Sequence, residues 1–257
     1  DHNFVLHYIS LNEARAFDIL IERINNGTIK GLVLTGYFSQ ELVAKILNTR
    51  VAAVAVAPFY SLPGLVKIEI DNQEGIKLII EHLLELGHKN IGFVSGGDSG
   101  MELPPFCARR NAFIEILAEH GLDTNNTYII PNWTSYVKYH QKTLDSIDKS
   151  LLKLSSNCTA LVCANDLIAR WVLSILQTYD VKVPEDCSIT GFDNIIWSSY
   201  LIPSLTTAAV PITEMGKMVV DILYKLINKK KTSNLYIVKP KIMIRDSTGP
   251  PKQKKIL

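Results

Sequence analysis

The chain has 257 residues, of which 47% are apolar and 20% are charged, and its formal net charge is +2 at pH 7. This size allows one or two globular domains. The small net charge gives no preference for a strongly acidic or strongly basic partner. No run of about 18 apolar residues occurs, which excludes a transmembrane helix.

Short apolar runs alternate with stretches of helical periodicity along most of the chain. The sequence predicts strands at 31–35, 51–57, 68–70, 91–94, 128–130, 159–163, 188–193, 235–238 and 241–244. It predicts helices at 41–47, 74–86, 109–120, 136–154, 167–179 and 213–228. This alternation is typical of parallel sheets covered by helices, either one wide sheet or two smaller ones.

Polar residues follow two of the predicted buried strands. Asn165 and Asp166 come after the apolar run that begins at Thr159, and Asp193 ends the run that begins at Ser188. Ligands of open α/β sheets bind just outside the carboxyl ends of the strands. The three side chains are therefore candidate ligand contacts.

The sequence offers no catalytic or metal-binding constellation. Ser99 lies in a glycine-rich loop, but a serine nucleophile needs a histidine base held by a carboxylate, and none is expected nearby. The four cysteines lack metal-ligand spacing and are expected to be the reduced thiols of a cytoplasmic protein. The N-terminus does not have the features of a signal peptide. We expect no enzyme activity, no cofactor and no metal site.

Ordered sequence landmarks run through nearly the whole chain. They lie at 71–75, 81–96, 109–113, 164–169, 183–194, 203–207, 215–216 and 244–247. With these landmarks the chain resembles the effector-binding core of the lactose-repressor and galactose-repressor (LacI/GalR) family of bacterial transcription regulators.

The resemblance implies an α/β, periplasmic-binding-protein-like fold of type I. It has two doubly wound parallel-sheet subdomains joined by three crossovers, with the ligand between them. The expected subdomains are residues 1–87 with 209–240 and residues 88–208 with 241–257. The family's opening strand and helix, and the helix-turn-helix head before them, are not found ahead of Phe4, so a fragment is expected.

The resemblance also implies a set of ligand-binding residues: Arg109, Asp193, Asn165, Trp133, Phe59, Glu74 and Ile212. Guanidinium offers a rigid fork of donors, a carboxylate accepts from paired hydroxyls, and an indole face covers a sugar ring. Other roles remain open. Arg109 could be an exposed residue of a first helical turn, with Arg110 as its solvated neighbour, and Trp133 could be a core residue. Asn165 could cap the helix that follows, although Asp166 competes for that position.

By this resemblance the chain is the effector-sensing domain of a dimeric repressor. A small molecule, expected to be a sugar, would control operator binding through a helix-turn-helix head outside this chain. Pro104, Pro105 and Ala112 depart from the family pattern and leave the ligand unnamed. The alternatives are a secreted sugar-binding protein of a transporter and a regulator that binds a phosphorylated carrier protein.

Overall fold

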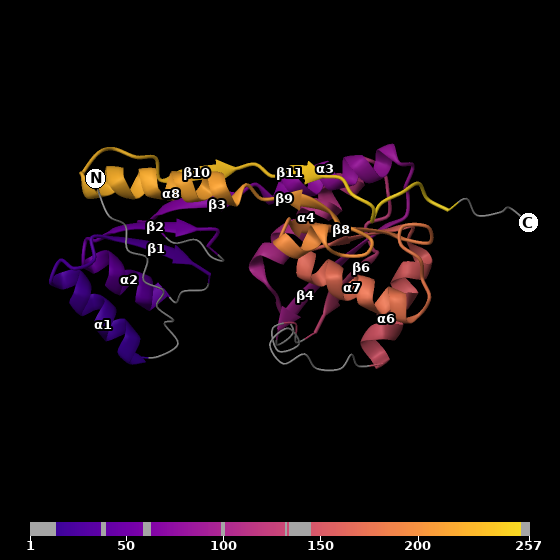
Figure 1. Ribbon diagram of the computed structural model, residues 1–257, viewed down its shortest axis with the longest axis horizontal. Coiled ribbons are helices and arrows are strands. Elements are labelled where there is room, and N and C mark those ends of the chain that lie inside the picture. The colour runs from indigo at the N-terminus through magenta and orange to yellow at the C-terminus, as the bar shows by residue number, and fades with distance from the viewer. Residues whose placement is uncertain are drawn as a thin grey trace, which may run out of the picture. The chain divides into compact units, whose positions relative to one another are not determined.

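The computed structural model describes residues 14–36, 40–58, 63–98, 101–131, 133 and 145–252. The chain divides into two compact units (Figure 1). Unit 1 comprises residues 1–69 with 213–237, and unit 2 comprises residues 70–212 with 238–257. The chain thus passes between the units three times, as the resemblance implied.

Unit 1 is built on a four-stranded sheet within the described residues. Its order is β1 (Gly31–Thr35), β2 (Ala52–Val56), β3 (Val66–Ile70) and β10 (Leu235–Val238). β1, β2 and β3 are parallel. The helices are α1 (Ala14–Asn25), α2 (Gln40–Asn48) and α8 (Ile212–Ile227), which begins at the boundary of the unit. Leu34, Val43 and Ile46 are among the residues of the core.

Unit 2 is built on a larger sheet, of seven strands in the described part of the chain. Its order is β11 (Lys241–Met243), β9 (Thr206–Ala209), β8 (Ser188–Asp193), β7 (Ala160–Cys163), β4 (Ile91–Asp98) and β5 (Met101–Glu102), with β6 (Thr127–Ile130) also paired to β4. β6, β4, β7, β8 and β9 are parallel, whereas β5 and β11 are antiparallel to their neighbours. Every residue of β7 is buried, which explains why its sequence is continuously apolar.

The helices of unit 2 are α3 (Asn72–Glu85), α4 (Pro104–Glu119), α6 (Asp145–Asn157) and α7 (Asp166–Thr178), with the short 3-10 helix η1 (Ile196–Ser199). They bury one apolar core against the sheet. Phe93 of β4 and Phe113 of α4 are both 0% exposed, and their ring centroids lie 5.2 Å apart. Each such buried ring contributes roughly 1.5–3 kcal/mol of burial free energy.

Helix α3 belongs to unit 2, whereas the resemblance placed it in the first subdomain, which was expected to include residues 1–87. The structure makes the first division after Glu69 instead of after Gly87. The reason is the apolar stripe that includes Ile76, Ile79 and Leu83, all of which are fully buried in the core of unit 2. Sequence periodicity identified the helix correctly, but it could not say which sheet the stripe covers.

Several elements were absent from the sequence-based prediction or had other bounds. Helix α1, strands β5 and β9 and the 3-10 helix η1 were not predicted, and α4 begins at Pro104 rather than at Arg109. Proline is well tolerated in the first turn of a helix because the N–H it lacks would have no partner there. Pro104 and Pro105 therefore form the start of the helix.

In the described residues no helix has the length and apolar character needed to cross a membrane.

Candidate functional site

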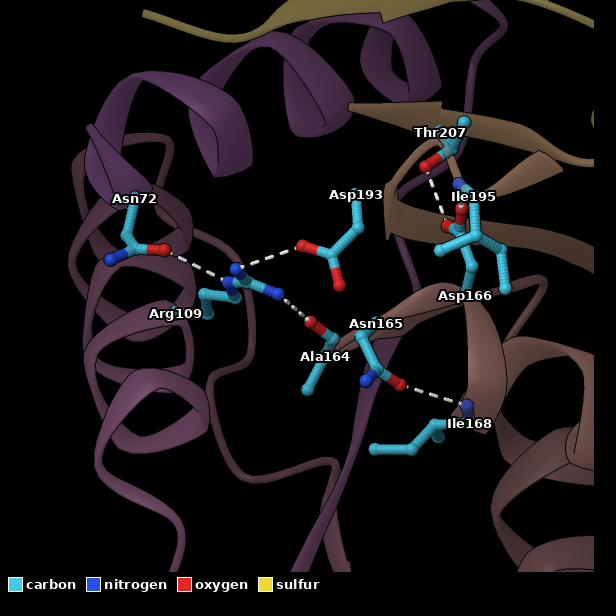
Figure 2. A network of polar contacts seen from close by, with 9 residues as sticks. All are labelled: Asn72, Arg109, Ala164, Asn165, Asp166, Ile168, Asp193, Ile195 and Thr207. Carbon is cyan, nitrogen blue, oxygen red and sulfur yellow. Dashed lines mark hydrogen bonds and ion pairs between the residues drawn. The ribbon is translucent and has the colours of Figure 1, made fainter. Parts of the chain in front are cut away.

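Polar side chains from several elements of unit 2 gather where strands β7 and β8 end (Figure 2). Arg109 comes from α4, Asn165 follows β7, and Asp193 is the last residue of β8. β7 and β8 are parallel neighbours, so their carboxyl ends meet at the same edge of the sheet. The structure brings Arg109, Asn165 and Asp193 to this edge of the sheet, and their role in ligand binding stays a prediction.

Arg109 is buried and fixed on all sides. Its Nε donates to Asn72 Oδ1 at 2.9 Å, its Nη1 to the Ala164 carbonyl at 2.6 Å, and its Nη2 to Asp193 Oδ1 at 3.1 Å. The guanidinium carbon lies 3.6 Å from the centroid of the Phe192 ring, a cation–π arrangement. Arg109 is only 4% exposed, which rules out the alternative of a solvated first-turn residue.

Asp193 ends β8 in an unusual backbone conformation. Its φ is 108°, and that of Asn194 is 55°, values that cost a non-glycine residue on the order of 1–3 kcal/mol. Arg245 Nη2 donates to Asn194 Oδ1 at 2.7 Å and helps to hold the turn. The Asp193 side chain is 31% exposed, and its second oxygen makes no hydrogen bond to the described residues. Figure 2 shows that oxygen directed away from Arg109.

Burial sets the electrostatics of this ion pair. Burial lowers the pKa of Arg109, and the charge of Asp193 opposes that effect. Burial likewise raises the pKa of Asp193 above its usual range, against the attraction of Arg109. Two charges taken out of water stabilise each other only while both are present, so removing either partner leaves a costly buried charge.

Asn165, not Asp166, is the N-cap of α7. Its Oδ1 accepts from the Ile168 amide at 2.9 Å while its backbone is extended. This is the capping role that the sequence left open, and it occupies only the oxygen of the amide. The Asn165 amide nitrogen makes no hydrogen bond within the described part of the chain, and in Figure 2 it points away from α7.

Asp166 is a buried structural carboxylate, 1% exposed. Its Oδ1 accepts from the Thr207 hydroxyl at 2.6 Å, and its Oδ2 accepts from the Ser198 hydroxyl at 2.6 Å and the Ile195 amide at 2.9 Å. It therefore ties β9 and the η1 segment to the start of α7. Gly191 makes room for it, since a Cβ there would lie 2.2 Å from Asp166 Oδ1. Burial raises its pKa, and these hydrogen bonds oppose the shift.

The four other residues expected at the ligand take no part in this hydrogen-bond network within the described residues. Trp133 is 5% exposed and packs edge-on against Trp171, with centroids 6.5 Å apart, so it occupies the core position that was the alternative. Glu74 lines a separate hollow of about 310 Å³ between α3 and α4. Ile212 is 65% exposed at the start of α8. Phe59 lies outside the described residues.

The sequence landmarks did not indicate the polar partners of the two arginines. Asn72 contacts Arg109, although the sequence favoured Glu74 from the same landmark at 71–75. Arg110 is not a solvated neighbour, because its Nε donates to Glu102 Oε2 at 2.8 Å and Ser95 donates to the other oxygen of that carboxylate. Asn72 is the first residue of a helix that follows shortly after a strand. That position is the sequence feature from which its place near the ligand edge could have been predicted.

A larger hollow, of about 650 Å³, lies at the amino ends of β4 and β7, whereas the candidate ligand residues lie at the carboxyl ends of β7 and β8. It is bordered by Asn90 and Thr159, which precede β4 and β7, and by Lys252. None of the candidate ligand residues lines it. Within the described residues no group of three or more histidine, cysteine, aspartate or glutamate side chains is arranged to hold a metal ion.

Comparisons with known proteins identify the family. The profile of the periplasmic binding protein-like domain matches residues 80–248. The HTH-type transcriptional repressor PurR of Aliivibrio salmonicida is 31% identical over 218 residues, which make up 84% of this chain and 63% of the repressor. The chain belongs to the periplasmic binding protein-like family. It spans about 63% of the length of that relative.

Solved structures show the same fold. The lac repressor dimer bound to operator and the anti-inducer ONPF superposes with a TM-score of 0.75 at 19% identity, over 95% of this chain and 82% of that one. A LacI family transcriptional regulator from Enterococcus faecium with bound ribose gives a TM-score of 0.74 at 24% identity, over 92% and 85% of the two chains. At these identities the likeness concerns the fold.

Proposed function

We propose that this chain is the effector-sensing core of a dimeric, cytoplasmic transcription repressor and not an enzyme. One observation carries the proposal: Arg109, Asp193 and Asn165 meet at the carboxyl-end edge of a parallel sheet in a chain of the LacI type. The relative reported above is a repressor, which favours regulation over the transporter alternative. Operator DNA would be bound by a helix-turn-helix head, since that relative is an HTH-type repressor.

The geometry favours a neutral ligand rich in hydroxyl groups. The charge of Arg109 is already balanced by Asp193, so the pair as a whole offers no net positive charge to a phosphate or carboxylate. The groups left over are one carboxylate oxygen of Asp193, which accepts, and the amide nitrogen of Asn165, which donates. A hydroxyl satisfies both because it donates and accepts. The ribose in the Enterococcus faecium regulator is a ligand of this kind.

Regulation requires that the ligand prefer one conformation of the protein. A ligand that binds two conformations equally shifts nothing, and coupling between ligand and operator is reciprocal. If the ligand weakens operator binding, the operator must weaken ligand binding by the same factor. In the full-length protein these two factors are measured separately and must agree.

The test is a thermal-shift and calorimetric screen of the chain with ribose, other neutral sugars, sugar phosphates and nucleobases. Asp193→Asn removes the carboxylate, Asn165→Ser keeps a capping oxygen but removes the amide nitrogen, and Glu115→Ala on the exposed face of α4 is the control. Ligand at 100 times its Kd stabilises the folded state by about 2.7 kcal/mol. We expect a neutral sugar to bind the chain and the control, and both site variants to lose at least tenfold in affinity.

Three results would contradict the proposal. Binding of only phosphorylated compounds would refute a neutral ligand, and unchanged binding by both site variants would move the site elsewhere. A monomeric mass in analytical ultracentrifugation, near the 28.7 kDa of a single chain at micromolar concentration, would contradict the dimer.

A further inference from the structure

Arg109 is connected to the segments in which the chain passes between its units. The first passage lies between Glu69 and Ile70, and the third lies between Ile237 and Val238. Strands β3 and β10 contain these two positions and are neighbours in one sheet. The residues that follow them, up to Asn72 and Pro240, lie in unit 2.

One route from Arg109 to these segments runs through hydrogen bonds. Arg109 Nε donates to Asn72 Oδ1 at 2.9 Å, and Asn72 is the first residue of α3 (Figure 2). The preceding residue, Asp71, caps α3 by accepting from the Glu74 amide at 2.9 Å. The backbone N–H of Asp71 in turn donates to the Val238 carbonyl at 2.9 Å. Two hydrogen bonds, joined by the peptide bond between Asp71 and Asn72, thus link the guanidinium to residues beside both passages.

A second route runs through packing. The Phe192 ring lies under the Arg109 guanidinium at 3.6 Å. The same ring touches the backbone of α3, because a Cβ at Gly75 would lie 2.4 Å from Phe192 Cε2 and 3.2 Å from Pro240 Cγ. Glycine is therefore needed where the ring, the helix and Pro240 meet. Phe192 directly precedes Asp193. A movement of the end of β8 would therefore also move the ring that packs against Gly75 and Pro240.

We propose that Asn72 is a positioning residue that couples the Arg109 guanidinium to the first and third passages of the chain. A ligand that hydrogen-bonds to Asp193 alters the ion pair, and the changed position of the guanidinium acts on its other partners, among them Asn72. The response reaches the Asp71–Val238 hydrogen bond through Asn72. The regulatory meaning of this coupling rests on the proposed function, whereas the coupling itself is a property of the ligand-free chain.

The experiment is amide hydrogen exchange, followed by NMR on the whole chain without ligand. The reporter is the Asp71 amide, compared with amides of β7 and β8 to correct for any change in global stability. In Asn72→Ala the Asp71 amide is expected to exchange about tenfold faster relative to that reference, because a charge-assisted hydrogen bond is lost. Asn72→Asp keeps an acceptor for Arg109 Nε and is expected to retain the wild-type protection. Asn111→Ala, the same change on the exposed face of α4, is the control.

Equal Asp71 protection in Asn72→Ala and the wild type would overturn the coupling. So would a loss in Asn72→Asp as large as in Asn72→Ala, or a loss that all amides share equally. Should Asn72→Ala fail to fold, Arg109→Lys removes the Nε donor from the other side and must give the same selective loss at Asp71. Failure of the sugar screen leaves these results intact, so the two proposals are tested separately.

Discussion

Replacing Asp166 should destabilise unit 2 more than any exposed substitution, because three donors, two of them fully buried side chains, depend on this one carboxylate. Ser198 and Thr207 are both 0% exposed, and with the Ile195 amide they donate to Asp166 over 2.6, 2.6 and 2.9 Å. In Asp166→Ala all three donors lose their acceptor, and each unsatisfied buried group costs about 1–3 kcal/mol. Relief from burying a carboxylate offsets part of that sum. We expect a net loss of roughly 3 kcal/mol.

Asp166→Asn separates charge from hydrogen bonding. The amide keeps one acceptor oxygen, and a serine or threonine hydroxyl can rotate to accept from its nitrogen, but the Ile195 amide cannot. If the amide oxygen faces Thr207, the Ile195 N–H is left without a partner, and the expected loss is about 1–2 kcal/mol. Asparagine should therefore be intermediate between aspartate and alanine.

The assay is urea denaturation followed by tryptophan fluorescence. All three tryptophans, Trp133, Trp171 and Trp197, lie in unit 2, so fluorescence reports on the unit that contains Asp166. Glu115→Ala is the control and should change stability by less than about 0.5 kcal/mol. A loss below about 1 kcal/mol in Asp166→Ala would refute the reasoning, since it would mean that the three donors find other partners.

Three further predictions concern other buried groups. Gly191→Ala should cost about 1–3 kcal/mol in the same assay, because its Cβ would lie 2.2 Å from Asp166 Oδ1 and 2.9 Å from Leu205. Arg110→Ala should cost about 2 kcal/mol, because it leaves the Glu102 carboxylate, 6% exposed, without its cation. Burial lowers the pKa of His88, so unfolding takes up a proton and stability should fall as the pH drops below about 6.5; His88→Gln should flatten that dependence between pH 7.5 and 5.

Each of these has a result that would count against it. A Gly191→Ala protein as stable as the wild type would mean that Asp166 can move, and an Arg110→Ala protein of unchanged stability would mean that Glu102 is hydrated. Parallel stability curves for the wild type and His88→Gln would mean that His88 keeps its ordinary pKa. His82 is lowered in pKa by burial as well, so a residual slope in His88→Gln is expected.

The sequence was most informative where local physics sets the structure. Strand β1 was predicted with the bounds that the structure gives it, and α3 was recognised from buried positions three and four residues apart with a glycine stop at Gly87, whose φ is 97°. Such patterns involve residues that are close together in the sequence, so they can be recognised from the sequence alone. Helix α1 shows the same kind of pattern, with Leu20 and Ile24 buried, and was nevertheless overlooked.

The candidate site was only partly predictable. Polar residues after apolar runs indicated the sheet edge and placed Asn165 and Asp193 there. Arg109 came from the family resemblance, and nothing in the sequence showed that it would be 4% exposed. Its partners lie 37, 55 and 84 residues away along the chain, at Asn72, Ala164 and Asp193. No local pattern records such distant contacts.

By itself, then, the sequence determined the alternation of strands and helices, the family, and the edge of the sheet where a ligand is expected. Only the tertiary structure decided that Asn165 caps a helix, that Asp166 is a structural carboxylate, that Trp133 is a core residue, and that α3 belongs to unit 2. The reason is physical. Burial and hydrogen-bond partners are properties of the folded chain, and the same residue type serves as a cap, a tie or a ligand contact depending on what packing brings beside it.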